Sequence, residues 1–223
     1  VGPWRAPYSN VHAFSSQCFI HELATAAGHD HLDFLLEMFG NPRWLKQGDI
    51  RSLNTERAVG VIKRVAQEGK WGKPMGLREG QGLAFYFCHA AHVAELAEVS
   101  VDPANRVTLR KVTVVADVGP IINRSGAVSQ IQGAVIDGYS AMVGQKITME
   151  NGVIAETNLD SYPVLRIDAA PEVDVFFIES DYAPTGLGEP ALPPLAPAVA
   201  NAIFSATGRR IRKMPLSELG YSV

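Results

Sequence analysis

The chain has 223 residues, 47% of them hydrophobic, so it is long and apolar enough to build a sizeable core. Its net charge of −3 and pI near 6.1 give no electrostatic case for binding nucleic acid. No apolar run approaches the ~20 residues that a membrane helix needs, and two cysteines cannot make a disulfide framework. The chain begins at Val1 rather than methionine, so we expect a piece of a longer protein. Its localisation cannot be read, because any targeting signal would lie upstream of Val1.

The first part of the chain has the apolar periodicity of helices. Helices are predicted over 13–27, over 30–39 and from Asn54 onward, with Asn54 as an N-cap. Residues 69–82 are rich in Gly, Lys and Pro and predict a loop. This loop suggests a boundary between a helical part, 1–70, and a part with strands and helices, 80–223.

From Gly82 onward, short β-branched runs predict strands over 83–88, 93–101, 106–116 and 173–178. Turn residues at 102–105 and 150–152 predict two hairpins. Helical spacing returns over 125–142 and 195–206. Because strands and helices do not alternate regularly, the predicted fold class is α+β, with a mixed sheet and packed helices.

The most informative stretch runs from Gly186 to Pro194 and places Glu189 between permissive glycines and a proline-rich helix start. The positive end of the helix dipole favours an ionised carboxylate there, whereas burial among Leu187 and Leu192 favours the neutral acid. The balance suits a general base that works near neutral pH. A carboxylate that simply caps the following helix is an equally weighted alternative.

One face of the predicted helix 125–142 carries Gly126, Gln130, Gly133 and Asp137, spaced by four, three and four residues. Each glycine costs roughly 1 kcal/mol against alanine inside a helix, so something bulky is expected against this face. Close packing on a neighbouring element is the favoured explanation. An amide that contacts a polar cofactor is the alternative.

Three further patterns have a structural and a functional interpretation. Arg5 stands among aromatics and prolines, where it could bind a carboxylate or simply pack on the surface. The Gly80-Gln81-Gly82 stretch is a weak phosphate-loop signal, and an ordinary turn is favoured. His89 and His92 would face opposite sides of a strand, so we expect no metal site from them.

Taken together, the motifs resemble those of the large, molybdenum-binding subunit of the xanthine dehydrogenase/aldehyde oxidase hydroxylases, in its C-terminal part. Within that family the likeness is nearest to the isoquinoline 1-oxidoreductase beta subunit and related aldehyde dehydrogenases. The motifs occur in the family's order over nearly the whole chain. They are Trp4-Arg5, His21 to Ala24, Asp117-Val118-Gly119 with Asn123, Gln130 to Gly133, Asn158 with Tyr162-Pro163, Gly186 to Pro190, and Pro194 to Ile203.

The resemblance implies that residues 1–223 are a C-terminal molybdenum-cofactor-binding domain fragment. It implies an oxidoreductase that hydroxylates an aldehyde or an N-heterocycle with oxygen derived from water. Glu189 is then the base, and Arg5 is similar to the substrate-orienting arginine. Gln130 is similar to a pterin-contacting glutamine, and we expect Gly126, Gly133 and Gly188 to lie against the cofactor.

The implied cofactor is molybdopterin, with cytosine dinucleotide as the favoured form. The implied partners are the remainder of the molybdenum subunit and an iron–sulfur subunit with [2Fe-2S] clusters. The family's glycine-rich cofactor segments are missing from this sequence, so we expect the chain alone to be inactive. The alternative from another class is a stand-alone, non-catalytic relic that acts in binding or assembly.

Overall fold

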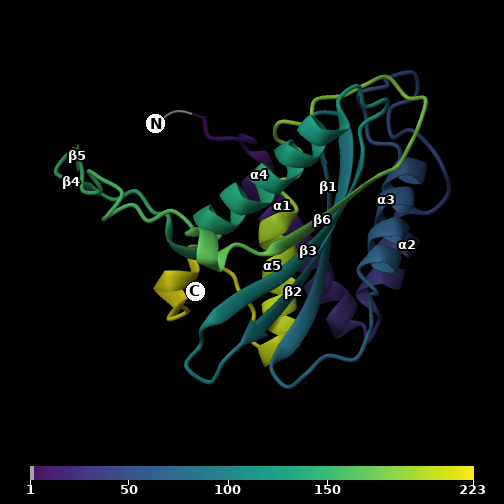
Figure 1. The fold of residues 1–223 in the computed structure, drawn as a ribbon. Helices are drawn as coiled ribbons and strands as arrows, with labels where there is room; N and C mark the ends of the chain where they lie inside the picture. The colour runs from purple at the N-terminus through teal and green to yellow at the C-terminus, as the bar shows by residue number, and fades with distance from the viewer. Residues whose placement is uncertain (1–2) are drawn as a thin grey trace.

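In the computed structural model, which describes residues 3–223, the chain folds around a four-stranded sheet with the strand order β1-β2-β3-β6 (Figure 1). The strands β1, β2 and β3 pair antiparallel, whereas β6 joins β3 in parallel. A separate two-stranded hairpin, β4 and β5, extends away from the body. The strand bounds are Glu79–Cys88 for β1, Ala91–Val101 for β2, Val107–Asp117 for β3, Met149–Glu150 for β4, Val153–Ile154 for β5 and Glu172–Phe177 for β6.

Helices cover both faces of the sheet. The α helices are α1 Ser9–Ala26, α2 His31–Phe39, α3 Thr55–Glu68, α4 Arg124–Gly144 and α5 Leu195–Thr207, and two short 3₁₀ helices are Ile167–Ala169 and Leu216–Leu219. One apolar cluster joins one face of the sheet to α4 and α5, and a second joins the other face to α2 and α3. Among residues 3–223, no helix is long and apolar enough to cross a bilayer.

The sheet topology and the solved structures confirm the predicted α+β class with a mixed sheet. Local sequence signals explain where most of the elements begin and end. Asp30 and Asn54 cap α2 and α3 by accepting backbone N–H bonds, as short polar side chains do. The turn after β2 is closed by Asp102, whose Oδ1 accepts from the amides of Ala104 and Arg106. Gly208 ends α5 with φ of 73°, a left-handed angle that favours glycine.

Both interpretations of Gly80-Gln81-Gly82, a phosphate loop and an ordinary turn, are wrong. The three residues lie inside β1, and the two glycines face the backbone of α5. A Cβ on Gly82 would lie 2.1 Å from the carbonyl oxygen of Ala198 and 2.2 Å from the amide nitrogen of Ala202. The glycines therefore permit a strand and a helix backbone to approach closely, which is a long-range contact that the local pattern does not reveal.

We therefore expect Gly82→Ala to lower the free energy of unfolding by about 3 kcal/mol, because the clashing atoms are backbone and cannot rotate away. Urea denaturation measures this change. Gly133→Ala is the matched control, because a Cβ there meets no atom within 4 Å in the described part of the chain. It should raise helix stability by up to about 1 kcal/mol. Equal stabilities for the two variants would contradict the packing argument.

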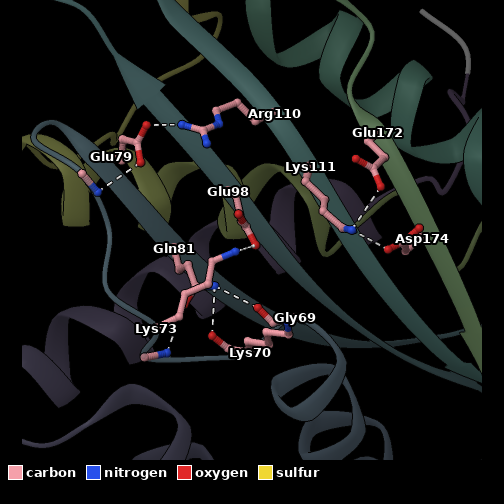
Figure 2. Close-up of polar contacts among 12 residues, drawn as sticks. Gly69, Lys70, Lys73, Glu79, Gln81, Glu98, Arg110, Lys111, Glu172 and Asp174 are labelled. Atoms are coloured by element: carbon pink, nitrogen blue, oxygen red, sulfur yellow. Dashed lines mark hydrogen bonds and ion pairs between the residues drawn. The ribbon is translucent and has the colours of Figure 1, made fainter.

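Side-chain hydrogen bonds fasten the loop before β1 to the sheet (Figure 2). Gln81 donates from Nε2 to the carbonyl of Gly69 at 3.0 Å, and its Oε1 accepts from the amide of Gly72 at 3.0 Å. The Nζ of Lys73 lies 2.6 Å from Oε1 of Glu98 on β2. These contacts tie the predicted loop to β1 and β2, so the connection after α3 is fixed at several points.

Three histidines are buried in an uncharged state. Burial, together with the charge of Arg210, lowers the pKa of His21 to about 4. Burial lowers the pKa of His31 to about 3, and burial with Arg57 nearby lowers that of His92 to about 3. The unfolded chain would bind protons at these positions near pH 6.5, whereas the fold does not. Each histidine therefore destabilises the fold as pH falls below that value.

Glu95 on β2 has the opposite effect on how stability depends on pH. Its carboxyl group is fully buried, and neither oxygen has a hydrogen-bond partner among residues 3–223. Burial raises the pKa of Glu95 well above its ordinary value, so the folded chain keeps a proton that the unfolded chain releases above about pH 4.5. Glu95 therefore adds stability as the pH falls from 7 towards 4.5.

The three histidines outweigh Glu95, so we expect the free energy of unfolding to be about 3 kcal/mol lower at pH 5 than at pH 7. Urea denaturation across this range measures the slope. In the variant His31→Leu the difference in unfolding free energy between pH 7 and pH 5 should shrink by about 2 kcal/mol, because one of the three protons is no longer taken up on unfolding. A curve that stays flat from pH 7 to pH 5 would contradict the neutral burial of these groups.

Candidate active site

Glu189 lies on the irregular segment 178–194 between β6 and α5, which we call the Glu189 loop. The helix that follows begins at Leu195, and its N-cap, Pro194, has no side-chain cap among the described residues. The alternative that Glu189 caps this helix is therefore wrong, because its carboxylate lies beside His89 instead. Gly186 and Gly188 do not have positive φ angles, and a Cβ on either would meet nothing within 4 Å in residues 3–223. The two glycines therefore leave open space beside the loop, and they are not needed for a left-handed backbone conformation.

A buried ion pair fixes the start of the Glu189 loop. Arg57 on α3 donates from Nε and Nη2 to the two carboxylate oxygens of Asp117, at 2.8 and 2.7 Å. The guanidinium also lies 4.4 Å from the ring centroid of Tyr182, and the hydroxyl of Ser180 donates to Asp117 at 2.8 Å. Burial would raise the pKa of Asp117, but the hydrogen bonds from Arg57 and Ser180 outweigh it and lower the pKa. Asp117 is thus held at the end of β3 by hydrogen bonds from Arg57 and Ser180.

A further contact sets how closely the loop lies against the end of β3. Gly119 has φ of 74°, and a Cβ there would lie 2.5 Å from the carbonyl oxygen of Tyr182. The amide of Thr185 donates to the carbonyl of Val118 at 3.0 Å. The Asp117-Val118-Gly119 motif therefore ends β3 and also packs against the Glu189 loop, which fixes the position of that loop.

The Glu189 loop and the β1–β2 turn enclose a cavity of about 860 Å³. Glu189, His89 and Arg51 supply its ionisable groups, and Phe87, Pro184 and Pro190 supply apolar surface. The Nε2 atom of His89 lies 2.5 Å from Oε2 of Glu189. A cavity with one carboxylate among mostly apolar walls is suited to a small, weakly polar organic molecule and to proton removal at one point.

Arg5 joins the N-terminal segment to this site. Its Nε donates to the carbonyl of Gly188 at 2.8 Å, and its Nη1 donates to Oδ2 of Asp137 on α4 at 3.1 Å. The carbonyl that Arg5 binds directly precedes Glu189 in the chain. Arg5 is therefore placed at the site, although its guanidinium is engaged by protein groups, and 25% of the side chain is exposed.

The face of α4 with Gly126, Gln130, Gly133 and Asp137, which we call the glycine face, leads to the Arg5–Asp137 contact. Gly126, Gln130 and Gly133 are exposed, and within the described residues an added Cβ at Gly126 would meet only Asn123. The opposite face of the helix is buried and includes Ile131, Val135 and Met142. The favoured explanation of close packing within this chain is thus wrong for these glycines, whose face is open.

His89 and Arg57 are the site residues that sequence reasoning missed. His89 lies in a two-residue turn with Ala90 rather than in a strand, while His92 turns inward on β2. The Nε2 atom of His92 accepts a hydrogen bond from the amide of Asn54 at 3.0 Å. Among the described residues, no group of three or more His, Cys, Asp or Glu side chains is arranged to hold a metal ion.

The family model described as "Molybdopterin cofactor-binding domain" matches residues 44–171. Among curated proteins, a "Membrane-bound aldehyde dehydrogenase [pyrroloquinoline-quinone]" of Gluconacetobacter polyoxogenes is 33% identical over 207 residues, which cover 90% of this chain and 27% of that protein. One of the subunits of the nicotinate dehydrogenase of Pseudomonas putida is 30% identical over 224 residues, 92% of this chain and 18% of that protein. The beta subunit of the isoquinoline 1-oxidoreductase of Brevundimonas diminuta is 27% identical over 209 residues, 91% of this chain and 25% of that protein.

The solved structures show the same fold at lower sequence identity. The aldehyde oxidoreductase of Desulfovibrio gigas aligns with a TM-score of 0.74 and 14% identity, over 98% of this chain and 40% of that one. The enzyme of Desulfovibrio desulfuricans aligns with a TM-score of 0.76 and 13% identity, over 96% and 40% of the two chains. The chain thus spans 18–27% of the length of the three curated relatives. Because the family model covers more than half of this sequence, the chain belongs to the molybdopterin cofactor-binding domain family.

Proposed function

We propose that this chain is part of the molybdenum-containing subunit of an oxidoreductase that hydroxylates an aldehyde or an N-heterocycle with oxygen derived from water. The observation that carries the proposal is the position of Glu189, a carboxylate that lines a cavity of about 860 Å³. Arg5 links the carbonyl of the adjacent Gly188 to Asp137 on the open glycine face of α4. The names of relatives support the substrate classes, since they include aldehyde, nicotinate and isoquinoline enzymes. The chain is the C-terminal domain of that subunit in this proposal, and a division near residue 70 stays a prediction.

The described residues fit a pterin cofactor. Gly133 leaves an unobstructed surface on α4, and the exposed amide of Gln130 one turn away can donate and accept hydrogen bonds. We place Gln130, Gly126 and Gly133 against the cofactor, with Gly188 at the edge nearest Glu189. We favour molybdopterin over the quinone in the name of one relative, because the matching family model describes molybdopterin. Cytosine dinucleotide is the form we propose.

Each residue of the chain then has a defined task. The bound molybdenum cofactor supplies the redox centre that accepts the electrons of the substrate. Glu189 accepts a proton within the cavity, and the apolar walls formed by Phe87, Pro184 and Pro190 limit the access of bulk water. Arg5 holds the Gly188 carbonyl, and its exposed part orients the substrate. An iron–sulfur subunit with [2Fe-2S] clusters would be the partner that takes up these electrons.

The test is co-expression of the chain with the remainder of the subunit and the iron–sulfur subunit. We expect the purified complex to contain molybdenum and to oxidise members of an aldehyde and N-heterocycle panel, while the chain alone does neither. A folded complex that contains no molybdenum would favour the alternative of a non-catalytic binding or assembly module.

A further inference from the structure

The turn between β1 and β2 has an unfavourable backbone at the edge of the cavity. His89 and Ala90 form the two-residue connection, with φ angles of 51° and 64°. Both residues therefore adopt left-handed conformations, which Asn-Gly sequences supply at the lowest cost. Alanine is disfavoured there, and histidine, although it adopts this conformation more often than most residues, is less favourable than glycine. Strained residues cluster at functional sites, so a strained turn beside a cavity suggests that one of its side chains has a role there.

The contact that His89 makes is with Glu189. Its Nε2 lies 2.5 Å from Oε2 of Glu189, which is an ion-pair contact, and Oε2 is enclosed and forms no hydrogen bond in the described part of the chain. About a third of the Glu189 side chain (34%) stays exposed, which leaves Oε1 as the accessible oxygen. Arg51 is the remaining charged side chain on the wall of the cavity, and the thiol of Cys88 lies near Glu189.

We infer that His89 is a positioning residue for Glu189, an inference that rests on the proposed function of Glu189 as the base. The close contact of Nε2 with Oε2 holds this oxygen against the β1–β2 turn and so directs Oε1 into the cavity. The tight turn makes the hold rigid, because the two flanking strands fix the position of the backbone on both sides.

The first test compares His89→Gly with Ala90→Gly in the complete enzyme. Both variants relieve a left-handed residue, so each should raise the unfolding temperature by about 2–4 °C in a domain of this size. His89→Gly should lower kcat about 10- to 100-fold with KM within about twofold, because a misplaced base costs rate rather than binding. Ala90→Gly should keep wild-type kcat. Equal kcat in the two variants, or a lower unfolding temperature in His89→Gly, would overturn the inference.

The second test does not depend on turnover. Diethyl pyrocarbonate modifies accessible imidazole nitrogens, and peptide mass spectrometry gives the rate at His89, whose side chain is 55% exposed. The rate should rise several-fold in Glu189→Gln, while that of the exposed His29 stays constant. An unchanged rate at His89 would overturn the inference. The proposed function is tested separately by turnover. If Glu189 is not the base, Glu189→Gln should retain turnover, whatever the modification rate at His89.

Discussion

Replacing Glu189 with glutamine in the assembled enzyme should lower kcat by about 10²–10⁴-fold, because the amide keeps the shape of the carboxylate but cannot accept a proton in its place. The molybdenum content should stay at the wild-type level, since the proposed cofactor contacts lie mainly on α4. Steady-state kinetics and metal analysis on the same preparation separate these two effects. A loss of both would indicate misassembly rather than loss of the base.

Asp181→Asn is the matched control for this prediction. It makes the same carboxylate-to-amide change on the same loop, at an exposed residue that has no side-chain hydrogen bond among residues 3–223. Its kcat should stay within about twofold of the wild type, as for surface substitutions in general. If Glu189→Gln behaved like Asp181→Asn, another group would have to remove the proton.

Arg57→Leu should lower the free energy of unfolding by about 3–5 kcal/mol, because it leaves the carboxylate of Asp117 buried without its charge partner. Both side chains are almost fully buried, so water cannot replace the lost contact. The Glu189 loop should loosen as well, since Arg57 and Asp117 contact its residues Tyr182 and Ser180. Urea denaturation measures the first effect, and hydrogen exchange in 178–190 measures the second.

Two further variants make this prediction specific. Arg64→Leu removes another arginine of α3, whose ion pair with Glu68 is solvent-exposed, and should cost less than about 1 kcal/mol. The double variant of Arg57→Leu with Asp117→Leu removes both buried charges and should be more stable than Arg57→Leu alone. A double variant that is as unstable as the sum of the single ones would show that the two residues act independently.

Local chemistry explains the parts of the fold that the sequence predicts well. Asp30 and Asn54 precede apolar helical runs and cap them, and Gly208 stops α5. The turn at Asn151-Gly152 has positive φ at both residues, as its composition predicts. Glu189 is found before α5 and beside a cavity, as the glycines and prolines around it predict for an irregular segment that precedes a helix.

Long-range contacts explain what the sequence does not predict. Gly80 and Gly82 appear as loop residues, because nothing near them in sequence reveals the α5 backbone that they face. The His89-Ala90 turn has neither the asparagine nor the glycine of its turn type, so the sequence does not predict the hairpin that joins β1 and β2. Arg57 pairs with a carboxylate sixty residues away, where spacing carries no signal.

The central claim is that the carboxylate of Glu189 faces the catalytic metal from within the cavity beneath its loop. The most direct test is a crystal structure of the loaded complex with anomalous diffraction at the molybdenum edge. We predict the metal at this cavity, with the carboxylate of Glu189 facing it. A metal seated elsewhere, with the Glu189 side chain turned into bulk solvent, would contradict the account.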